Sequence, residues 1–144
     1  MKYLILFALV FLAQASHAQR RPEGAFTASH CASTPQITRV CIGMIARRGA
    51  AIALYGNNSY TEVYDILDST IVSSTSQTIT SSLRLVKAGS LDDRGIVIRP
   101  IGMSEMVIAR RQTKRTNGSP VRLTFQTPTG ITVNATNFEY MLSP

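Results

Sequence analysis

The sequence predicts an all-β fold, a single antiparallel sandwich or small barrel of roughly seven to nine short strands. From residue 36 onward, short runs rich in Ile, Val, Thr and Tyr alternate with clusters of Gly, Pro, Asn and Asp, which is typical of antiparallel β domains. Charged residues make up only 16% of the chain and apolar residues 44%, a composition that argues against disorder. A chain of 144 residues without internal repeats is long enough for one such domain.

Residues 1–18 are predicted to form a cleaved signal peptide. Lys2 precedes an apolar run over residues 3–13, and small residues follow at the positions that a signal peptidase reads, with cleavage expected after Ala18 or, as the alternative, after Ala15. The apolar run is about half as long as a membrane-spanning helix needs to be, so we expect it to direct export and not to anchor the chain. The sequence therefore predicts a periplasmic or extracellular protein with no transmembrane span after signal removal.

Cys31 and Cys41 are the only two cysteines, and an even pair in an exported protein predicts a disulfide. A bridge that closes a loop of this length should stabilise the fold by roughly 2 to 3 kcal/mol. A metal site is the rival interpretation, but His30 is the one histidine after the leader and no Cys-x-x-Cys spacing occurs. Residues 19–35 are polar and aperiodic, so we expect an exposed N-terminal arm, tied by the bridge to a β domain over residues 36–144.

Turn residues divide the β domain into short segments. Arg47, Arg48 and Gly49 are predicted to form the first hairpin turn, with Gly49 in the left-handed position of a three-residue turn. Residues 78–87 alternate between apolar and polar side chains, which indicates a strand with one face near solvent. Pro100 is expected to end a strand or to mark an edge strand. The predicted strands are residues 37–46, 50–55, 60–68, 70–74, 78–87, 96–101, 105–111, 121–127 and 131–142.

Residues 60–68 fit two local structures. Ser59 followed by Glu62 is a capping-box pattern, and the apolar side chains around and after Glu62 recur at helical spacing. Tyr, Thr, Val and Ile dominate the segment, however, and these residues favour strands. A strand is therefore favoured here, with one short helix as the alternative.

A cluster of cations between residues 110 and 115 is the strongest functional signal in the sequence. It covers the end of the strand expected over residues 105–111 and the start of the loop expected over residues 112–120. Arg side chains can bind phosphate, sulfate or carboxylate groups through two hydrogen bonds at once. Arg47 and Arg48 extend this patch if both turns lie at the same end of the fold. The predicted ligand-binding residues are Arg110, Arg111, Lys114, Arg115, Arg47 and Arg48.

This basic cluster has two interpretations. As a binding surface it would contact an anionic polymer, a lipid headgroup or an acidic protein. As a solvated hairpin tip it would only keep the domain soluble and block association between sheet edges. Nucleic acid is disfavoured as a partner, because no aromatic residue interleaves the cations to stack on bases. Without the leader, the formal charge of +6 biases the chain toward acidic partners.

Catalytic chemistry is poorly represented in the sequence. No Gly-x-Ser-x-Gly motif is present, and His30 is expected to lie beside the disulfide. Glu62, Asp65 and Asp68 could pair for acid–base work on a sugar, but a solvated face explains them as well. The two aspartates at residues 92–93 suit a turn. No catalytic residue, metal ligand or cofactor is predicted.

The sequence thus predicts an exported, non-catalytic binding module that contacts an anionic partner through basic loops. A structural subunit of a surface appendage or envelope assembly, joined by strand addition, is the second hypothesis. A small hydrolase with paired carboxylates is the third. The oligomeric state stays open, as does glycosylation at the Asn-x-Ser/Thr sequons of Asn57, Asn117 and Asn134.

Overall fold

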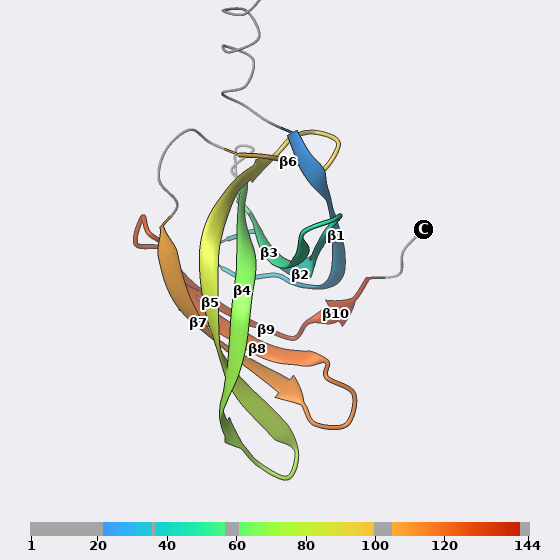
Figure 1. Cartoon of the computed structure of the whole chain (residues 1–144). Helices are drawn as coiled ribbons and strands as arrows, with labels where there is room; N and C mark the ends of the chain where they lie inside the picture. Colours follow the sequence, from blue (N-terminus) through green and yellow to red (C-terminus); the bar gives the residue numbers. More distant parts are fainter. Residues whose placement is uncertain (1–21, 36, 57–60, 100–104, 142–144) are drawn as a thin grey trace, which may run out of the picture.

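The computed structural model describes residues 22–35, 37–56, 61–99 and 105–141, and every helix or strand element among them is a β-strand (Figure 1). The predicted all-β fold is thus confirmed. None of the described residues belongs to a helix long and apolar enough to cross a membrane. The signal peptide predicted for residues 1–18 lies outside the described residues. The strands are β1 (Pro22–Ala32), β2 (Arg39–Ile45), β3 (Gly49–Tyr55), β4 (Thr61–Ser74), β5 (Thr78–Leu91), β6 (Ile96–Ile98), β7 (Met106–Lys114), β8 (Pro120–Gln126), β9 (Thr132–Thr136) and β10 (Glu139–Tyr140).

Antiparallel strand pairing closes one ring, and the covalent connection between β9 and β10 completes a second; the two rings share β1 to β5 (Figure 1). In the small ring, β6 pairs with β5 on one side and with β1 on the other. In the large ring, the sheet continues from β5 through β7 and β8 to β9. The chain then turns at Asn137, whose φ is 60°, and β10 pairs with β1. The strand predicted over residues 131–142 is therefore two short strands, which close the large ring through a kink.

Strands β3 and β4 form the wall between the rings, and their central residues are buried on both faces. Successive side chains of a strand alternate between faces, so Ala51 and Val63 face the small ring whereas Ile52 and Tyr64 face the large one. Burial on both faces explains why β3 is almost continuously apolar. The small core comprises Ile45, Ala51, Ala53, Val63, Ala88 and Val97, and the large core comprises Ala32, Ile37, Val40, Ile52, Leu54, Tyr64, Leu83, Leu85, Val107, Ala109, Leu123, Phe125, Val133 and Ala135.

The expectation of an exposed arm over residues 19–35 is wrong for residues 22–32, which form β1 and pair with β2, β6 and β10. The polar composition conceals this strand, because ladder hydrogen bonds come from the backbone and need no apolar side chain. Gly43 of β2 lets the two strands approach closely, since a Cβ atom at this position would lie 2.0 Å from the Thr27 carbonyl oxygen. Residues 19–21 lie outside the described residues.

The predicted disulfide between Cys31 and Cys41 is confirmed. The two residues are direct partners across β1 and β2, their Cα atoms are 4.1 Å apart, and both side chains are buried. The bridge therefore joins two neighbouring strands that both rings use.

Strand lengths differ from the prediction in two places. The strands expected at residues 60–68 and 70–74 are one strand, β4, and the helical alternative is wrong for the described residues of this segment, because β4 pairs with β3 and β5. Irregularities in the β4–β5 register maintain the pairing along this length. Strands β7 and β8 reach to Lys114 and begin at Pro120, so their connection is shorter than expected. With β1 included, the described residues hold ten strands instead of seven to nine, and Pro100 lies outside them.

Asp92 builds the turn between β5 and β6, as the sequence predicts. Its carboxylate accepts hydrogen bonds from the backbone N–H groups of Ile96 (3.0 Å) and Arg94 (2.8 Å). These hydrogen bonds hold the pKa of Asp92 below its usual range, and the bond from Ile96 contributes most. The turn directs β6 back across the top of the molecule to complete the small ring (Figure 1).

Candidate functional site

The cations of the predicted basic cluster do not all lie on one face, because β7 continues to Lys114 and its side chains alternate between faces. Arg110 lies opposite Ser82 of β5 on the outer face of the sheet and is exposed. Arg111 lies opposite Leu123 of β8, on the face that carries the large core. The strand therefore divides two neighbouring arginines between solvent and interior.

Arg111 is a half-buried cation. Its Nε atom is buried and has no hydrogen-bond partner among the described residues. Loss of solvent around the guanidinium lowers its pKa from the usual value. A side chain in this position can contribute little to a surface that an external partner must reach.

Arg115 connects two turns. Its guanidinium donates a hydrogen bond to the Thr75 carbonyl oxygen (2.9 Å), and its backbone N–H donates one to the Gln77 carbonyl oxygen (2.9 Å). These bonds fasten the β7–β8 turn to the tip of the projecting β4–β5 hairpin (Figure 1). Arg115 thus has a structural contact in addition to its charge.

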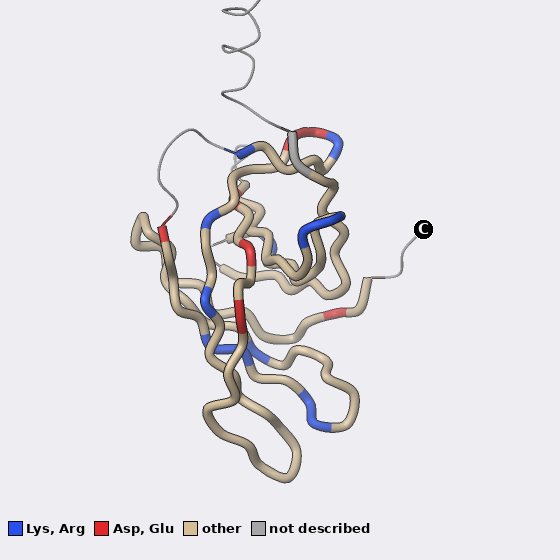
Figure 2. The backbone as a smooth tube through the Cα atoms, viewed as in Figure 1, with Lys and Arg blue, Asp and Glu red and all other residues tan. Residues whose placement is uncertain are grey.

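Arg47 and Arg48 do not extend the patch around β7 and β8. Arg48 forms an ion pair with Asp65 of β4, whereas Thr75, the partner of Arg115, lies ten residues further along the same hairpin. At about 3.3 Å per residue, that interval is about 30 Å of extended chain. The basic segments of the β2–β3 turn and the β7–β8 turn are accordingly well separated in Figure 2.

A different set of cations gathers on the outer face of β7 and β8. Arg110, Gln112 and Lys114 alternate on one face of β7, and Arg122 of β8 lies directly opposite Gln112. The Nε–H group of Arg122 donates a hydrogen bond to Asn134 Oδ1 (3.1 Å), which restricts the guanidinium to this face. We call these four residues the basic face. Next to them is a hollow of about 150 Å³ lined by Thr80, Arg110, Gln112, Arg122 and Thr124.

A larger cleft of about 560 Å³ adjoins the basic face at the kink of the C-terminal strands. Lys114 and Arg122 contribute its cations, and none of the described residues that line it carries a carboxylate. The rings of His30 and Tyr140 form another wall, with centroids 5.3 Å apart in an edge-to-face contact, and Tyr140 is 66% exposed. The lining residues are His30, Gln112, Lys114, Ser119, Pro120, Val121, Arg122, Thr136, Asn137, Phe138 and Tyr140.

A second cleft, of about 510 Å³, lies beside the first and is also lined by Asn137. Its cation is Arg39, whose Nη2 atom lies 3.3 Å from the sulfur of Cys31 and whose guanidinium lies 5.9 Å from the centroid of the Tyr55 ring. The disulfide thus forms part of the wall and positions a cation. The lining residues are Cys31, Ala32, Ser33, Arg39, Thr136, Asn137, Glu139 and Met141.

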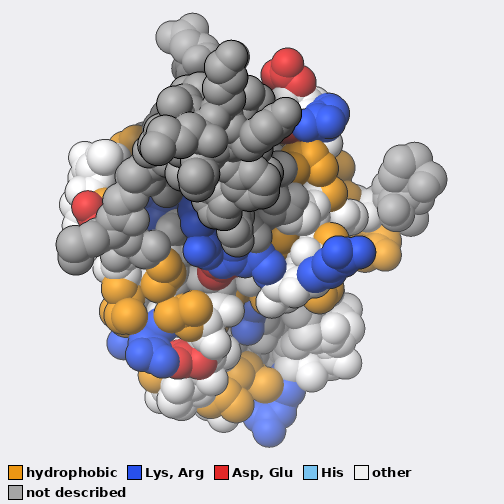
Figure 3. All heavy atoms as spheres, turned by 45° about the horizontal axis from the view of Figure 1, so that its top comes forward, with side chains coloured by type: hydrophobic (Ala, Val, Ile, Leu, Met, Phe, Trp, Pro, Cys, Tyr) orange, Lys and Arg blue, Asp and Glu red, His pale blue; other side chains and the backbone are white. Residues whose placement is uncertain are grey.

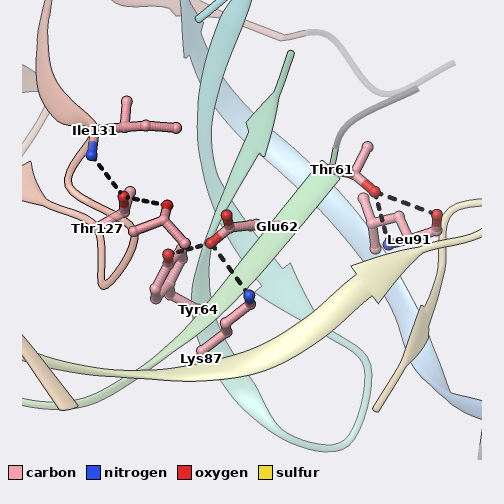
Figure 4. Close-up of polar contacts among 8 residues, drawn as sticks. Thr61, Glu62, Tyr64, Lys87, Leu91, Thr127 and Ile131 are labelled. Carbon is pink, nitrogen blue, oxygen red and sulfur yellow. Dashed lines mark hydrogen bonds and ion pairs between the residues drawn. The ribbon is translucent and has the colours of Figure 1, made fainter. Parts of the chain in front are cut away.

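Glu62, one of the three candidate acid–base groups, is buried and engaged in a polar network (Figure 4). Its carboxylate accepts a hydrogen bond from the Tyr64 hydroxyl and lies 3.7 Å from Lys87 Nζ. Burial, together with the hydrogen bond to Glu62, raises the pKa of Tyr64 well above its usual value. The network provides a hydrogen-bond donor and a cation for a carboxylate that is only 3% exposed.

The other two candidate carboxylates each have a separate cation. Asp65 pairs with Arg48, and Asp68 pairs with Arg84, which lowers the pKa of Asp68. The structure therefore does not bring any two of the three predicted carboxylates together. Among the described residues, no group of three or more His, Cys, Asp or Glu side chains is arranged to hold a metal ion.

Comparison with known proteins finds no family model, no curated protein and no solved structure that matches this chain. The sequence draws attention to Arg110 and Lys114, which the structure does place on the basic face. It gives no signal for Arg122, an isolated cation within a strand, or for Tyr140. Both line the first cleft, whose walls come from β1, β7, β8, β9 and β10.

Proposed function

We propose that the chain is an exported, non-catalytic binding module that contacts an anionic partner through the basic face. The observation that carries this proposal is the cleft in which Lys114 and Arg122 meet without a carboxylate among the described lining residues. Cations in such a concave site focus their field and attract an anionic group more strongly than the same charges would on a convex surface.

The chemistry of the basic face supports the same proposal. Arg110 and Arg122 can each bind a carboxylate, sulfate or phosphate group through two hydrogen bonds, whereas Lys114 offers a point charge. The side-chain amide of Gln112 already donates one hydrogen bond to Thr78 Oγ1 (3.2 Å), and its second N–H group can donate a neutral hydrogen bond to a ligand. On the face viewed in Figure 3, Lys and Arg side chains are widespread and Asp and Glu side chains are sparse, in keeping with the positive net charge.

The proposal also places the protein outside the cytoplasm, in an oxidising compartment. The disulfide between Cys31 and Cys41 suits an oxidising space, and the predicted leader would deliver the chain there. Mass spectrometry of the natively purified protein should find residues 1–18 removed and no free thiol; an intact leader or two free thiols would contradict export.

Two double variants test the basic face at equal net charge. Lys114→Ser/Arg122→Ser removes two of its cations, and Arg47→Gly/Arg94→Ser removes two exposed cations elsewhere, with glycine suited to the φ of 69° at Arg47. We expect the first variant to elute from a sulfated resin at clearly lower salt than the second, because only the first removes clustered charges. Elution of both variants at the same salt concentration would show that net charge alone governs retention.

Strand addition in an assembly is a second candidate function, and the edge of β9 favours it. Among the described strands β9 pairs only with β8, so its other edge offers backbone groups to an incoming strand. An assembly subunit should form concentration-dependent oligomers in size-exclusion chromatography. A monomer at all concentrations would speak against this function and leave the basic face unaffected.

A further inference from the structure

The hollow and the two clefts adjoin one another. Gln112 and Arg122 line both the hollow and the first cleft, and Thr136 and Asn137 line both the first and the second cleft. Adjoining hollows therefore follow a path from Arg110, across the kink at the C-terminal strands, to Arg39. We call this path the seam groove.

The seam groove carries a cation in every section. Arg110 and Arg122 border the hollow, Lys114 and Arg122 the first cleft, and Arg39 the second. Among the described lining residues, Glu139 in the second cleft is the only carboxylate. Charges repeated along a path suit a ligand whose own charges repeat.

The size of the seam groove also indicates an extended ligand. The two clefts measure about 560 and 510 Å³, and each falls in the range of about 300–1,000 Å³ that holds one small molecule. The clefts share Thr136 and Asn137 but lie on opposite faces of the β1–β10 ladder, because His30 and Tyr140 line the first whereas Cys31 and Glu139 line the second. A chain of linked units that occupied both would therefore pass over the kink. A single small anion would use only one section.

Neutral polar groups stand between the cations. Gln112, Ser119, Thr136 and Asn137 line the first cleft and offer amide and hydroxyl groups, and Tyr140 presents an exposed ring beside them. Sugar hydroxyls form hydrogen bonds with such groups, and the apolar face of a sugar ring packs against an aromatic side chain.

We propose that the seam groove binds a linear acidic polysaccharide, a proposal that rests on the anion-binding function above. Carboxylate or sulfate groups of successive units pair with Arg110, Arg122 or Lys114, and Arg39, while one sugar ring packs on Tyr140. Single-stranded nucleic acid is a weaker fit, because its binding relies on several aromatic side chains that stack successive bases. Among the described residues that line the groove, Tyr140 is the only aromatic side chain that is largely exposed.

The first test is a length series. Carboxylated oligogalacturonates and sulfated heparin oligosaccharides, each from dimer to octamer, are titrated into the whole mature protein, with neutral dextran oligomers and oligothymidylate as comparison ligands. Affinity should rise by about tenfold or more from dimer to hexamer, because each further section of the groove adds linked contacts, and the preferred series identifies carboxylate or sulfate as the anionic group. Equal affinity for dimer and hexamer in both acidic series, or tighter binding of oligothymidylate, would overturn the proposal.

The second test separates this proposal from the proposed function. Tyr140→Ser removes the ring without changing charge, and Tyr140→Phe retains it. We expect Tyr140→Ser to weaken binding of the acidic hexamer by about fivefold or more, in the range of one lost aromatic contact, with Tyr140→Phe close to the original protein. Retention on the sulfated resin should be the same for all three.

Each outcome of the second test has a distinct meaning. Hexamer binding that is unaffected by Tyr140→Ser overturns the polysaccharide proposal alone, provided that the resin still distinguishes the Lys114→Ser/Arg122→Ser variant. Failure of the resin to distinguish that variant overturns the proposed function as well. If Tyr140→Ser unfolds, Lys114→Ser decides the question, because it should weaken binding of the hexamer more than binding of the dimer; an equal effect on both would count against the groove.

Discussion

The small ring and the large ring share five strands but are closed in different ways. In the small ring, the short strand β6 is hydrogen-bonded on both sides, and the core behind it consists mainly of Ala and Val side chains. The large ring has a core with Leu, Phe and Tyr side chains and is closed by strands that kink at Asn137. Its two clefts lie on either side of this kink. The difference indicates that continuous pairing stabilises the sheet, whereas the bent closure creates the clefts of the proposed binding surface.

The largest expected effect comes from the core of the large ring. Leu123 is fully buried there, and Leu123→Ala should lower the free energy of unfolding by about 2–5 kcal/mol, because it removes apolar contacts and leaves a cavity. Chemical denaturation measures this change. Ile108→Ala, at a side chain that is 54% exposed on neighbouring β7, is the control and should change stability by about 0.5 kcal/mol or less. Equal losses in both variants would refute the assignment of the large core.

The disulfide affects both rings, because it joins β1 to β2. Replacement of Cys31 and Cys41 by serine should lower the free energy of unfolding by about 2–3 kcal/mol, the value expected for a loop of this length. Denaturation of the native protein with and without a reducing agent provides an independent measurement. A double variant as stable as the original protein would mean that strand pairing alone holds β1.

Closure of the small ring depends on Gly89 of β5. Its φ of 149° disfavours other residues, and a Cβ atom there would lie 2.0 Å from the Ile98 carbonyl oxygen of β6. Gly89→Ala should therefore displace β6 and cost about 1–3 kcal/mol. Gly118→Ala is the matched control, because Gly118 also has positive φ but has open space around its Cβ position. Hydrogen exchange at β6 should accelerate only in Gly89→Ala; unchanged protection of β6 would refute the role of Gly89.

Acid should weaken the small ring through Asp92. Its pKa is depressed in the folded state by the hydrogen bonds of the β5–β6 turn, so its contribution is present above the ordinary value of 3.8 and is lost as pH falls through the folded value. Unfolding curves at decreasing pH should fall more steeply for the original protein than for Asp92→Asn. If the free energy of unfolding fell equally with pH in both proteins, the ionisation of Asp92 would not be linked to folding.

Alkali should weaken the large ring through Tyr64, with the opposite sign. Burial and the hydrogen bond to Glu62 raise its pKa in the folded state, so its contribution is complete below the ordinary value of 10.0 and declines as pH rises above it. In Tyr64→Phe this part of the pH dependence should disappear, although the variant is less stable at neutral pH because Glu62 loses a buried donor. A slope above pH 10 identical to that of the original protein would contradict this linkage.

Local patterns in the sequence predict much of this fold. Alternation over residues 78–87, turn residues at Gly49 and Asp92, and the cysteine pair all correspond to features of the structure. The strand β1 escapes prediction because backbone pairing holds a polar segment. The sequence predicts a basic loop at residues where strand β7 in fact continues. Because each successive residue of a strand faces the opposite side, the continued strand separates side chains that a loop would leave on one surface. The clefts depend on contacts between the two ends of the chain, which no local pattern encodes.

The two-residue pairing of β10 with β1 has a mechanical consequence. Tension applied at the carboxyl terminus would act first on this short ladder, because β10 is the described strand nearest that end of the chain. The force would reach β9 and the two cores only after β10 had separated from β1. The seam groove would then widen while the two hydrophobic cores stay intact. A load on the end of the chain would thus open the clefts of the proposed binding surface without unfolding the domain.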